Sequence, residues 1–246
     1  MIKFASINIE GDSHRRSVVS FLREFGADVI CFQELSAPSL AFFEHELGMK
    51  GYFLPIGSTN AVPQDKASPV EPFGVALFSS FPISNIKTDY YDGGVGDVPT
   101  IIHGDENTIW RGLLQGTVTK GDERYNIAVT HFTRTPDGSA SDKQRRDMRN
   151  LLNLLVKTPE VILCGDFNAP RGGEIFKMIA DTYKDNIPPE YDTSLDSKLH
   201  RIERIEKGKK LMVDGLFTTS AYIVSDAKLS EGVSDHKAVT AIISLV

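Results

Sequence analysis

The stretch from Val161 to Pro170 constrains the fold more than any other part of the chain. Its sequence is Val-Ile-Leu-Cys-Gly-Asp-Phe-Asn-Ala-Pro, an apolar run that stops at a glycine, a carboxylate and an amide. This pattern predicts a buried strand that cannot continue past the proline and the Gly-Gly pair that follows. The oxygens of Asp166 and Asn168 would suit a hard cation or a phosphate. The alternative is an ordinary Asx-type turn after a core strand.

Other predicted strands also end beside polar side chains that a core would reject. These side chains are Asn8, Glu34, His131, and Asp235 with His236. Each alone is usually a solvated turn residue or a structural histidine, but their coincidence in one chain favours a shared site. The set contains a carboxylate for a divalent cation, an aspartate to deprotonate water, and amides and imidazoles to neutralise phosphoryl oxygens. We therefore predict a site for phosphoryl chemistry at the strand ends.

The remaining pattern predicts many strands and a few amphipathic helices. Helices are expected over Arg15–Phe25 with Ser13 as cap, Pro38–Leu47, Asp142–Val156 with Ser139 or Ser141 as cap, and Glu174–Thr182. Strands are expected over Ile2–Ile7, Val29–Phe32, Tyr52–Ile56, Gly74–Ser79, Leu113–Val118, Tyr125–Thr130, Leu211–Phe217, Tyr222–Asp226 and Lys237–Leu245. Residues 57–72, 89–107 and 186–210 are expected to be loops. This composition predicts two sheets packed face to face with helices outside.

Composition sets broad limits on the class of protein. The 246 residues are 41% hydrophobic and 24% charged, which predicts one globular domain over residues 1–246. The net charge of −6 gives no global electrostatic case for nucleic-acid binding, although a local basic patch is compatible with it. Cys31 and Cys164 lie in apolar runs, so we expect small buried hydrophobes and not a disulfide or a metal pair.

No targeting or membrane segment is apparent. The N-terminal apolar run is short and lacks a cleavage pattern, which argues against a signal peptide. No apolar run approaches the roughly 20 residues that a membrane helix needs. We expect a cytoplasmic monomer without a membrane anchor.

The strand-end motifs resemble those of the endonuclease/exonuclease/phosphatase superfamily, the deoxyribonuclease I-like metal-dependent phosphoesterases. The resemblance covers nearly the whole chain, and its motifs stand in the family's order. They are Asn8, Gln33-Glu34, Gly74–Ser79 with Phe81-Pro82-Ile83, Thr130-His131, Gly165-Asp166-Phe167-Asn168, Val213-Asp214-Gly215 and Ser234-Asp235-His236. The resemblance implies a four-layer αββα sandwich of two mixed sheets, with the site at one end of the sheets.

The resemblance also implies a metal site. Glu34 would be the principal ligand of Mg²⁺, with Mn²⁺ as a substitute. Asn8 would contact metal or phosphate, and Glu10 stands where many members have an acidic residue in the metal's water shell. Asp235 would support His236 or approach the metal.

Further roles follow from the same resemblance. Asp166 would activate the attacking water, and Asn168 would contact phosphate or metal. His236 would bind the scissile phosphate, oriented by Asp214. His131 stands where deoxyribonucleases, sphingomyelinases and tyrosyl-DNA phosphodiesterases have histidine and some abasic-site nucleases have tyrosine. The implied reaction is in-line attack of water on a phosphoester.

The substrate is less constrained than the reaction. Between residues 198 and 210, six cations oppose two anions, which suggests a contact with a phosphate backbone or, alternatively, a solvated loop. The cations are Lys198, Arg201, Arg204, Lys207, Lys209 and Lys210. The cations Arg145, Arg146 and Arg149 of the predicted helix could likewise contact a phosphate backbone or simply be solvated. Trp110 would either stack a base or pack internally. A nucleic-acid substrate is slightly favoured over a phospholipid, an inositol phosphate or a sugar phosphate. A non-catalytic binding module is the least favoured function.

Overall fold

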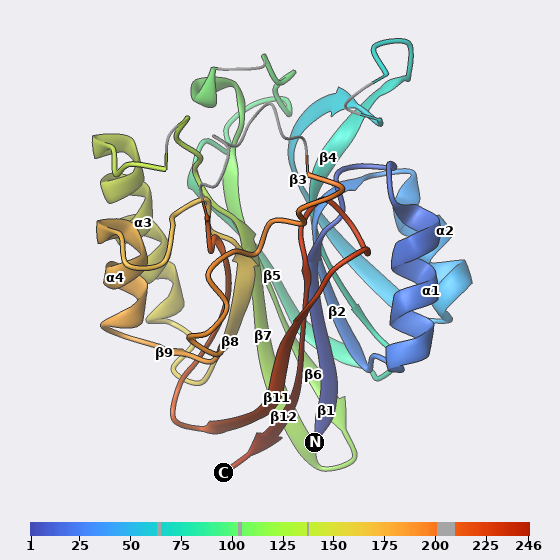
Figure 1. Cartoon of the computed structure of the whole chain (residues 1–246), viewed down its shortest axis with the longest axis vertical. Coiled ribbons are helices and arrows are strands. Elements are labelled where there is room, and N and C mark those ends of the chain that lie inside the picture. Colours follow the sequence, from blue (N-terminus) through green and yellow to red (C-terminus); the bar gives the residue numbers. More distant parts are fainter. Residues whose placement is uncertain (63–64, 103–104, 137, 201–209) are drawn as a thin grey trace.

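Two six-stranded β-sheets pack face to face, and helices cover the outer face of each sheet (Figure 1). The computed structural model describes residues 1–62, 65–102, 105–136, 138–200 and 210–246. Each sheet is mixed, because one pair of neighbouring strands in each is parallel and the other pairs are antiparallel. The predicted four-layer αββα sandwich is therefore confirmed.

The first sheet contains both ends of the chain. Its strand order is β11-β12-β1-β2-β4-β3, in which β1 and β2 are the parallel pair. The strands are β1 (Ile2–Asn8), β2 (Val29–Ser36), β3 (Lys50–Asn60), β4 (Val70–Ser79), β11 (Tyr222–Ser230) and β12 (Ala238–Leu245).

The second sheet is built from the middle of the chain. Its strand order is β5-β6-β7-β8-β10-β9, in which β7 and β8 are the parallel pair. The strands are β5 (Ile83–Asp92), β6 (Arg111–Lys120), β7 (Glu123–His131), β8 (Ile162–Asp166), β9 (Lys184–Asp185) and β10 (Asp214–Thr218).

The helices form the two outer layers. The helices α1 (Arg15–Phe25) and α2 (Ser39–Leu47) pack on the first sheet. The helices α3 (Asp142–Leu155) and α4 (Glu174–Ala180) pack on the second. A short 3-10 turn, η1 (Glu106–Thr108), precedes β6.

The central core lies between the sheets and follows from strand alternation. In β1, Ile2 and Phe4 face the other sheet, whereas Ala5 and Ile7 face the helices. Burial of each large apolar side chain contributes about 1.5–3 kcal/mol to folding. Cys31 and Cys164 lie in this central core as free, fully buried thiols, as predicted.

The strand directions bring the polar strand ends to one edge. β1 and β2 end there, as do β7 and β8, because both pairs are parallel. The antiparallel partners β10 and β12 begin at the same edge, so that Asp214 pairs in register with Asp166. Both termini lie at the opposite end of the sandwich (Figure 1).

Several strands are longer than the sequence predicts. The expected loop at 57–72 is shorter, because β3 continues to Asn60 and β4 begins at Val70. The expected loop at 89–107 begins inside β5, an edge strand with mostly exposed or half-buried residues and therefore a weak apolar pattern. β11 continues to Ser230, whereas β10 begins only at Asp214.

The cap predicted for the first helix is wrong. A turn that starts with left-handed Glu10 and Gly11 continues to residue 14, so the cap position falls on His14 and not on Ser13. His14 makes no side-chain capping bond. At α3, Ser141 is the cap, and its hydroxyl accepts a hydrogen bond from the Gln144 amide.

Within the described ranges, no helix is both long enough and apolar enough to cross a membrane.

Candidate active site

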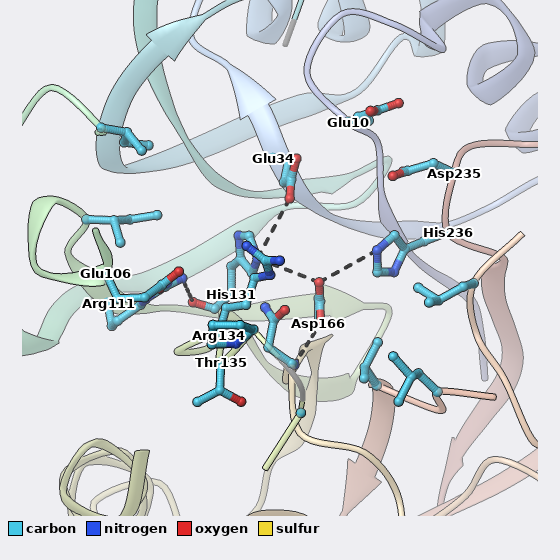
Figure 2. A pocket seen from close by; sticks show the side chains of 18 of the residues that line it. Glu10, Glu34, Glu106, Arg111, His131, Arg134, Thr135, Asp166, Asp235 and His236 are labelled. Carbon is cyan, nitrogen blue, oxygen red and sulfur yellow. Dashed lines mark hydrogen bonds and ion pairs between the residues drawn. The ribbon is translucent and has the colours of Figure 1, made fainter. Parts of the chain in front are cut away.

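The shared edge of the two sheets contains a cavity of about 250 Å³. All the predicted site residues line it except Asn8 and Asp214, which lie directly behind it. Figure 2 shows Glu34, His131, Asp166 and His236 joined by a continuous line of contacts. The structure therefore brings together every side chain that the sequence placed at the site.

Backbone strain is concentrated at this edge. Glu10, Glu34 and Asn168 have φ angles of 47°, 61° and 49°, a left-handed conformation that residues other than glycine rarely adopt. Glu34 lies in a bulge, where the pairing of β2 with β4 shifts register between Phe32 and Leu35. Each such residue costs about 1–3 kcal/mol, and strain of this kind gathers at functional sites.

Asn8 links the two main carboxylates. Its Nδ2 donates to Oε1 of Glu34 at 3.1 Å and to Oδ2 of Asp166 at 3.2 Å. Its Oδ1 accepts the backbone N–H of Glu10 at 3.2 Å. Since a carbonyl oxygen has two lone pairs, Oδ1 keeps one acceptor position for a ligand.

Asp166 is buried at the centre of the site. Its Oδ1 accepts the Asn168 N–H at 2.8 Å, and its Oδ2 lies 3.6 Å from Nε2 of His131 and 3.9 Å from Nε2 of His236. Burial raises the pKa of Asp166 to about 6, although the positive charge of His236 opposes the rise. A carboxylate with this pKa can exchange a proton near neutral pH.

The two histidines differ in charge. Burial alone would lower the pKa of His236, but the carboxylates of Asp214 and Asp166 outweigh it and raise that pKa well above the usual value. This shift favours the imidazolium form of His236, whose Nδ1 lies 2.8 Å from Oδ2 of Asp214. Burial and the charges of Arg111 and His236 lower the pKa of His131, which is therefore neutral.

Three further polar contacts hold residues that line the cavity. Asn168 donates from Nδ2 to the carbonyl of Phe132 at 3.1 Å, which orients its amide. Arg111 is almost fully buried, donates to the carbonyl of His131 at 3.3 Å and pairs with Glu106 at 2.6 Å.

The donor set fits a hard divalent cation. Glu10, Glu34 and Asp235 supply carboxylate oxygens at one side of the cavity (Figure 2). Burial raises the pKa of Glu34 and raises the pKa of Asp235 to about 6, and Coulombic repulsion among the carboxylates adds to both shifts. An ion at this position would relieve the repulsion that raises these pKa values.

The segment that contains Ser194 and Asp196 braces the site. Ser194 Oγ accepts the backbone N–H groups of Val213 and Asp214. Asp196 accepts the N–H groups of Lys198, Leu199 and Gly232, and its own N–H donates to the carbonyl of Asp235. The segment thus ties the start of β10 in one sheet to the residues before β12 in the other.

Sequence reasoning missed one residue that lines the cavity, Arg134, and one residue that contacts a lining residue, His14. Arg134 lines the cavity just after β7, and its charge contributes to the low pKa of His131. His14 lies 3.1 Å from Glu10 at the start of α1. The four-residue spacing of Glu10 and His14 is a weak indication that the two side chains are neighbours. No sequence pattern indicates that Arg134 belongs to the site.

Two of the helix cations and Trp110, for which nucleic-acid contacts were one alternative, contact other residues of the chain. Arg145 pairs with Glu174 and Asp142, and Arg146 pairs with Asp92 and Asp147. Trp110 packs edge-on against Tyr90 with the ring centroids 5.0 Å apart. Most of the basic stretch, residues 201–209, lies outside the described residues.

Comparison with known proteins agrees with this architecture. The model of the endonuclease/exonuclease/phosphatase family matches residues 5–236, so the chain belongs to that family of phosphoesterases. A comparison with curated proteins finds no match.

Solved structures share the fold at low sequence identity. The human Nocturnin catalytic domain with bound sulfate anion is 18% identical, with a TM-score of 0.73 over 100% of this chain and 93% of that chain. A family member from Leptotrichia buccalis is 15% identical, with a TM-score of 0.72 over 100% of both chains. The mannosyl-6-phosphatase of Bacteroides thetaiotaomicron is 14% identical, with a TM-score of 0.68 over 100% of both chains.

Proposed function

We propose that the protein is a Mg²⁺-dependent hydrolase of phosphoesters, with Asp166 as the base that takes the proton of the attacking water. The observation that carries the proposal is the environment of Asp166. This carboxylate has a pKa of about 6 and lies within 4 Å of both a neutral and a charged imidazole. General-base catalysis is most effective when the pKa of the base lies near the working pH.

The remaining residues bind and orient the phosphoryl group. The His236 imidazolium, held by Asp214, donates to the phosphoryl oxygens, where negative charge grows in the transition state. Neutral His131 and the amide of Asn168 offer further hydrogen bonds to the substrate. Asn8 keeps Glu34 and Asp166 at a fixed separation.

The metal site consists of Glu34, Glu10 and Asp235, and Asn8 orients Glu34 through its Nδ2 hydrogen bond. When bound, Mg²⁺ stabilises charge on the phosphoryl and leaving oxygens. The protein supplies the hard oxygen ligands and keeps them clustered against their mutual repulsion. Mn²⁺ has the same preference for oxygen and should substitute.

The cavity itself favours a compact organic phosphate. Its wall includes the apolar side chains of Ile101, Ile109 and Phe73 and the cation Arg134. Among the described residues, no carboxylate pairs with Arg134, so its guanidinium can bind an anionic group of the substrate. The fold neighbour described as a mannosyl-6-phosphatase gives further support to a sugar phosphate or a similar monoester.

A nucleic-acid substrate is the second candidate, and the basic stretch at 198–210 is the observation that favours it. Neutralising Lys207, Lys209 and Lys210 together should then weaken binding and flatten its salt dependence. Turnover of a small phosphodiester should barely change. An unchanged salt slope would leave the stretch as a solvated loop.

One substrate panel tests the proposal. The metal-stripped protein with added Mg²⁺ would be assayed on sugar phosphates, inositol phosphates, DNA, RNA, 5′-adducted DNA and sphingomyelin. We expect hydrolysis of at least one class, and its loss in Asp166→Asn. Equal rates for the wild type and Asp166→Asn would contradict the assignment of the base.

A further inference from the structure

A carboxylate lines the active-site cavity outside the proposed metal site. It belongs to Glu106, in the 3-10 turn η1, and its side chain is 28% exposed. Figure 2 shows it beside Arg111, at the side of the cavity away from Glu10 and Asp235. Neither the proposed base nor the proposed metal ligands account for a negative charge at this position.

Arg111 holds one oxygen of this carboxylate in place. Its Nη2 donates to Oε2 of Glu106 at 2.6 Å, and its Nη1 donates to the carbonyl of His131 at 3.3 Å. Arg111 is only 2% exposed, so its guanidinium cannot turn away into solvent. Asp105 holds the turn itself, because its Oδ1 accepts the N–H of Asn107 at 3.0 Å. The carboxylate is therefore preorganised, and it loses little side-chain entropy when it binds a ligand.

The second oxygen of Glu106 can bind a ligand. Within the described parts of the chain, Oε1 accepts no hydrogen bond and forms no ion pair, since the contact with Arg111 uses Oε2. A carboxylate accepts hydrogen bonds and donates none, so its ligand at this oxygen must carry O–H or N–H groups. Hydrogen bonds to a charged acceptor are roughly twice as strong as those to a neutral one. Hydroxyl groups of a bound molecule therefore suit this position, whereas phosphoryl oxygens do not.

Apolar side chains line the cavity next to this turn. Ile101, Ile109 and Phe73 belong to its wall and pack together in one apolar cluster. A pocket with an apolar wall and a few placed polar groups fixes the orientation of the molecule that it binds. A sugar ring fits both features, since it has an apolar C–H face and hydroxyl groups at its edge. An alkyl group would use the wall alone and would leave the carboxylate desolvated without a hydrogen bond, which is unfavourable.

Neutralisation of a buried arginine is the alternative explanation for Glu106. Removing one partner of a buried ion pair usually destabilises a protein, so Arg111 needs a counterion whether or not a ligand binds. That role uses Oε2 alone and does not require a second oxygen at the cavity. The two explanations differ in one measurable respect, because only a ligand-binding carboxylate makes affinity depend on the hydroxyl groups of the ligand.

We propose that Glu106 is a specificity-determining residue, which accepts hydrogen bonds from the hydroxyl groups of the substrate and so selects a phosphorylated sugar. Arg111 is the positioning residue that holds this carboxylate. The inference rests on the proposed function in one respect, which is that the cavity binds a phosphoester. The identities of the ion and of the base do not enter it.

Binding of matched ligands tests the inference. Calorimetry with Mg²⁺ present would compare methylene-phosphonate analogues of hexose 6-phosphates and ribose 5-phosphate with 2-cyclohexylethylphosphonate, which has no hydroxyl groups on its ring. We expect the wild type to bind the best sugar ligand about 10–100-fold more tightly than the cyclohexyl ligand. Glu106→Gln keeps the volume and an acceptor for Arg111 but loses the charge, so this preference should fall by about 5–30-fold. Its affinity for the cyclohexyl ligand should stay nearly unchanged.

Glu46 provides the matched control. It too is a carboxylate paired with an arginine, Arg23 at 2.8 Å, and its side chain is 29% exposed, but it lies on α2 outside this cavity. Glu46→Gln should keep the wild-type preference. Equal wild-type affinities for the sugar and cyclohexyl ligands, or a full sugar preference in Glu106→Gln, would overturn the inference.

A ligand series on the wild type does not depend on the folding of a variant. Monodeoxy analogues of the tightest sugar ligand would be measured in the same way. At least one lost hydroxyl group should weaken binding by about tenfold, and the same loss should have little effect in Glu106→Gln. If every monodeoxy analogue binds the wild type as tightly as the parent sugar, the inference is wrong. Sugar-selective binding without hydrolysis of any phosphoester would contradict the proposed function alone, whereas hydrolysis without sugar preference would contradict this inference alone.

Discussion

Nδ1 of His236 lies 2.8 Å from Oδ2 of Asp214, and Asp214 pairs in register with Asp166 on the neighbouring strand. One ladder position therefore places the proposed base beside the carboxylate that raises the pKa of His236. The two aspartates differ in their surroundings, since Asp214 contacts His236 and Asp166 lines the cavity.

The contact between Asp214 and His236 predicts a non-additive pair of mutations. His236→Ala should lower kcat by about 10²–10³, the usual effect of removing a donor to developing negative charge. Asp214→Asn removes the charge that favours the imidazolium, so its effect should largely vanish in the His236→Ala background. The measurement is kcat for both single variants and the double variant. Multiplying losses would show that Asp214 does not work through the histidine.

Asp166→Asn keeps the shape of the side chain but removes the base. We expect kcat to fall by about 10²–10⁴, with substrate affinity unchanged or improved because a negative charge near the phosphate is lost. Since the base must be deprotonated, the wild-type rate should rise with pH and level off above the pKa, which is about 6 without metal and lower with a cation nearby. If kcat of Asp166→Asn still falls at low pH as the wild type does, the fall is caused by the protonation of another group.

Arg134 should select for anionic substrates. Arg134→Leu should lower kcat/KM for a phosphomonoester by about 10–100-fold, mainly through KM, as expected for the loss of about 1.5–3 kcal/mol of charged hydrogen bonds. Arg124→Leu is the matched control, because Arg124 is exposed near the start of β7, at the other end of the sheet from His131. The measurement is kcat/KM of both variants from steady-state kinetics. Equal losses in Arg134→Leu and Arg124→Leu would show that Arg134 does not contact the substrate.

Asp196 predicts a pH-dependent contribution to stability. Burial would raise its pKa, but hydrogen bonds from the N–H groups of Gly232, Lys198 and Leu199 lower it below 3.8. The stabilisation is therefore complete above pH 3.8 and is lost as the pH falls through the lower folded-state value. Asp196→Asn should lower the free energy of unfolding by about 1–3 kcal/mol at neutral pH. Urea unfolding of the metal-stripped proteins should show a constant difference between about pH 7 and 5 and a smaller one below about pH 4.

How much the sequence could predict differs between parts of the site. Asp166 and His236 were predictable, because an apolar strand next to a carboxylate or an imidazole is a local pattern. The bulge that turns Glu34 into the site was not, since it depends on how β2 pairs with β4. The exposed edge strand β5 was missed because its alternation is weak. Arg134 was missed because its place in the cavity wall depends on the fold and not on its neighbours in sequence.

Hydrolysis by this protein should depend on a divalent cation. Hydrolysis would be measured for chelator-treated protein, after Mg²⁺ or Mn²⁺ is restored, and for Glu34→Gln over a range of Mg²⁺ concentrations. We expect no turnover without metal, recovery with either ion, and a raised Mg²⁺ requirement in Glu34→Gln at a near-normal melting temperature, because the variant loses a hard oxygen charge but keeps its shape. Undiminished hydrolysis by the metal-free protein, or a wild-type response to Mg²⁺ in Glu34→Gln, would contradict the account.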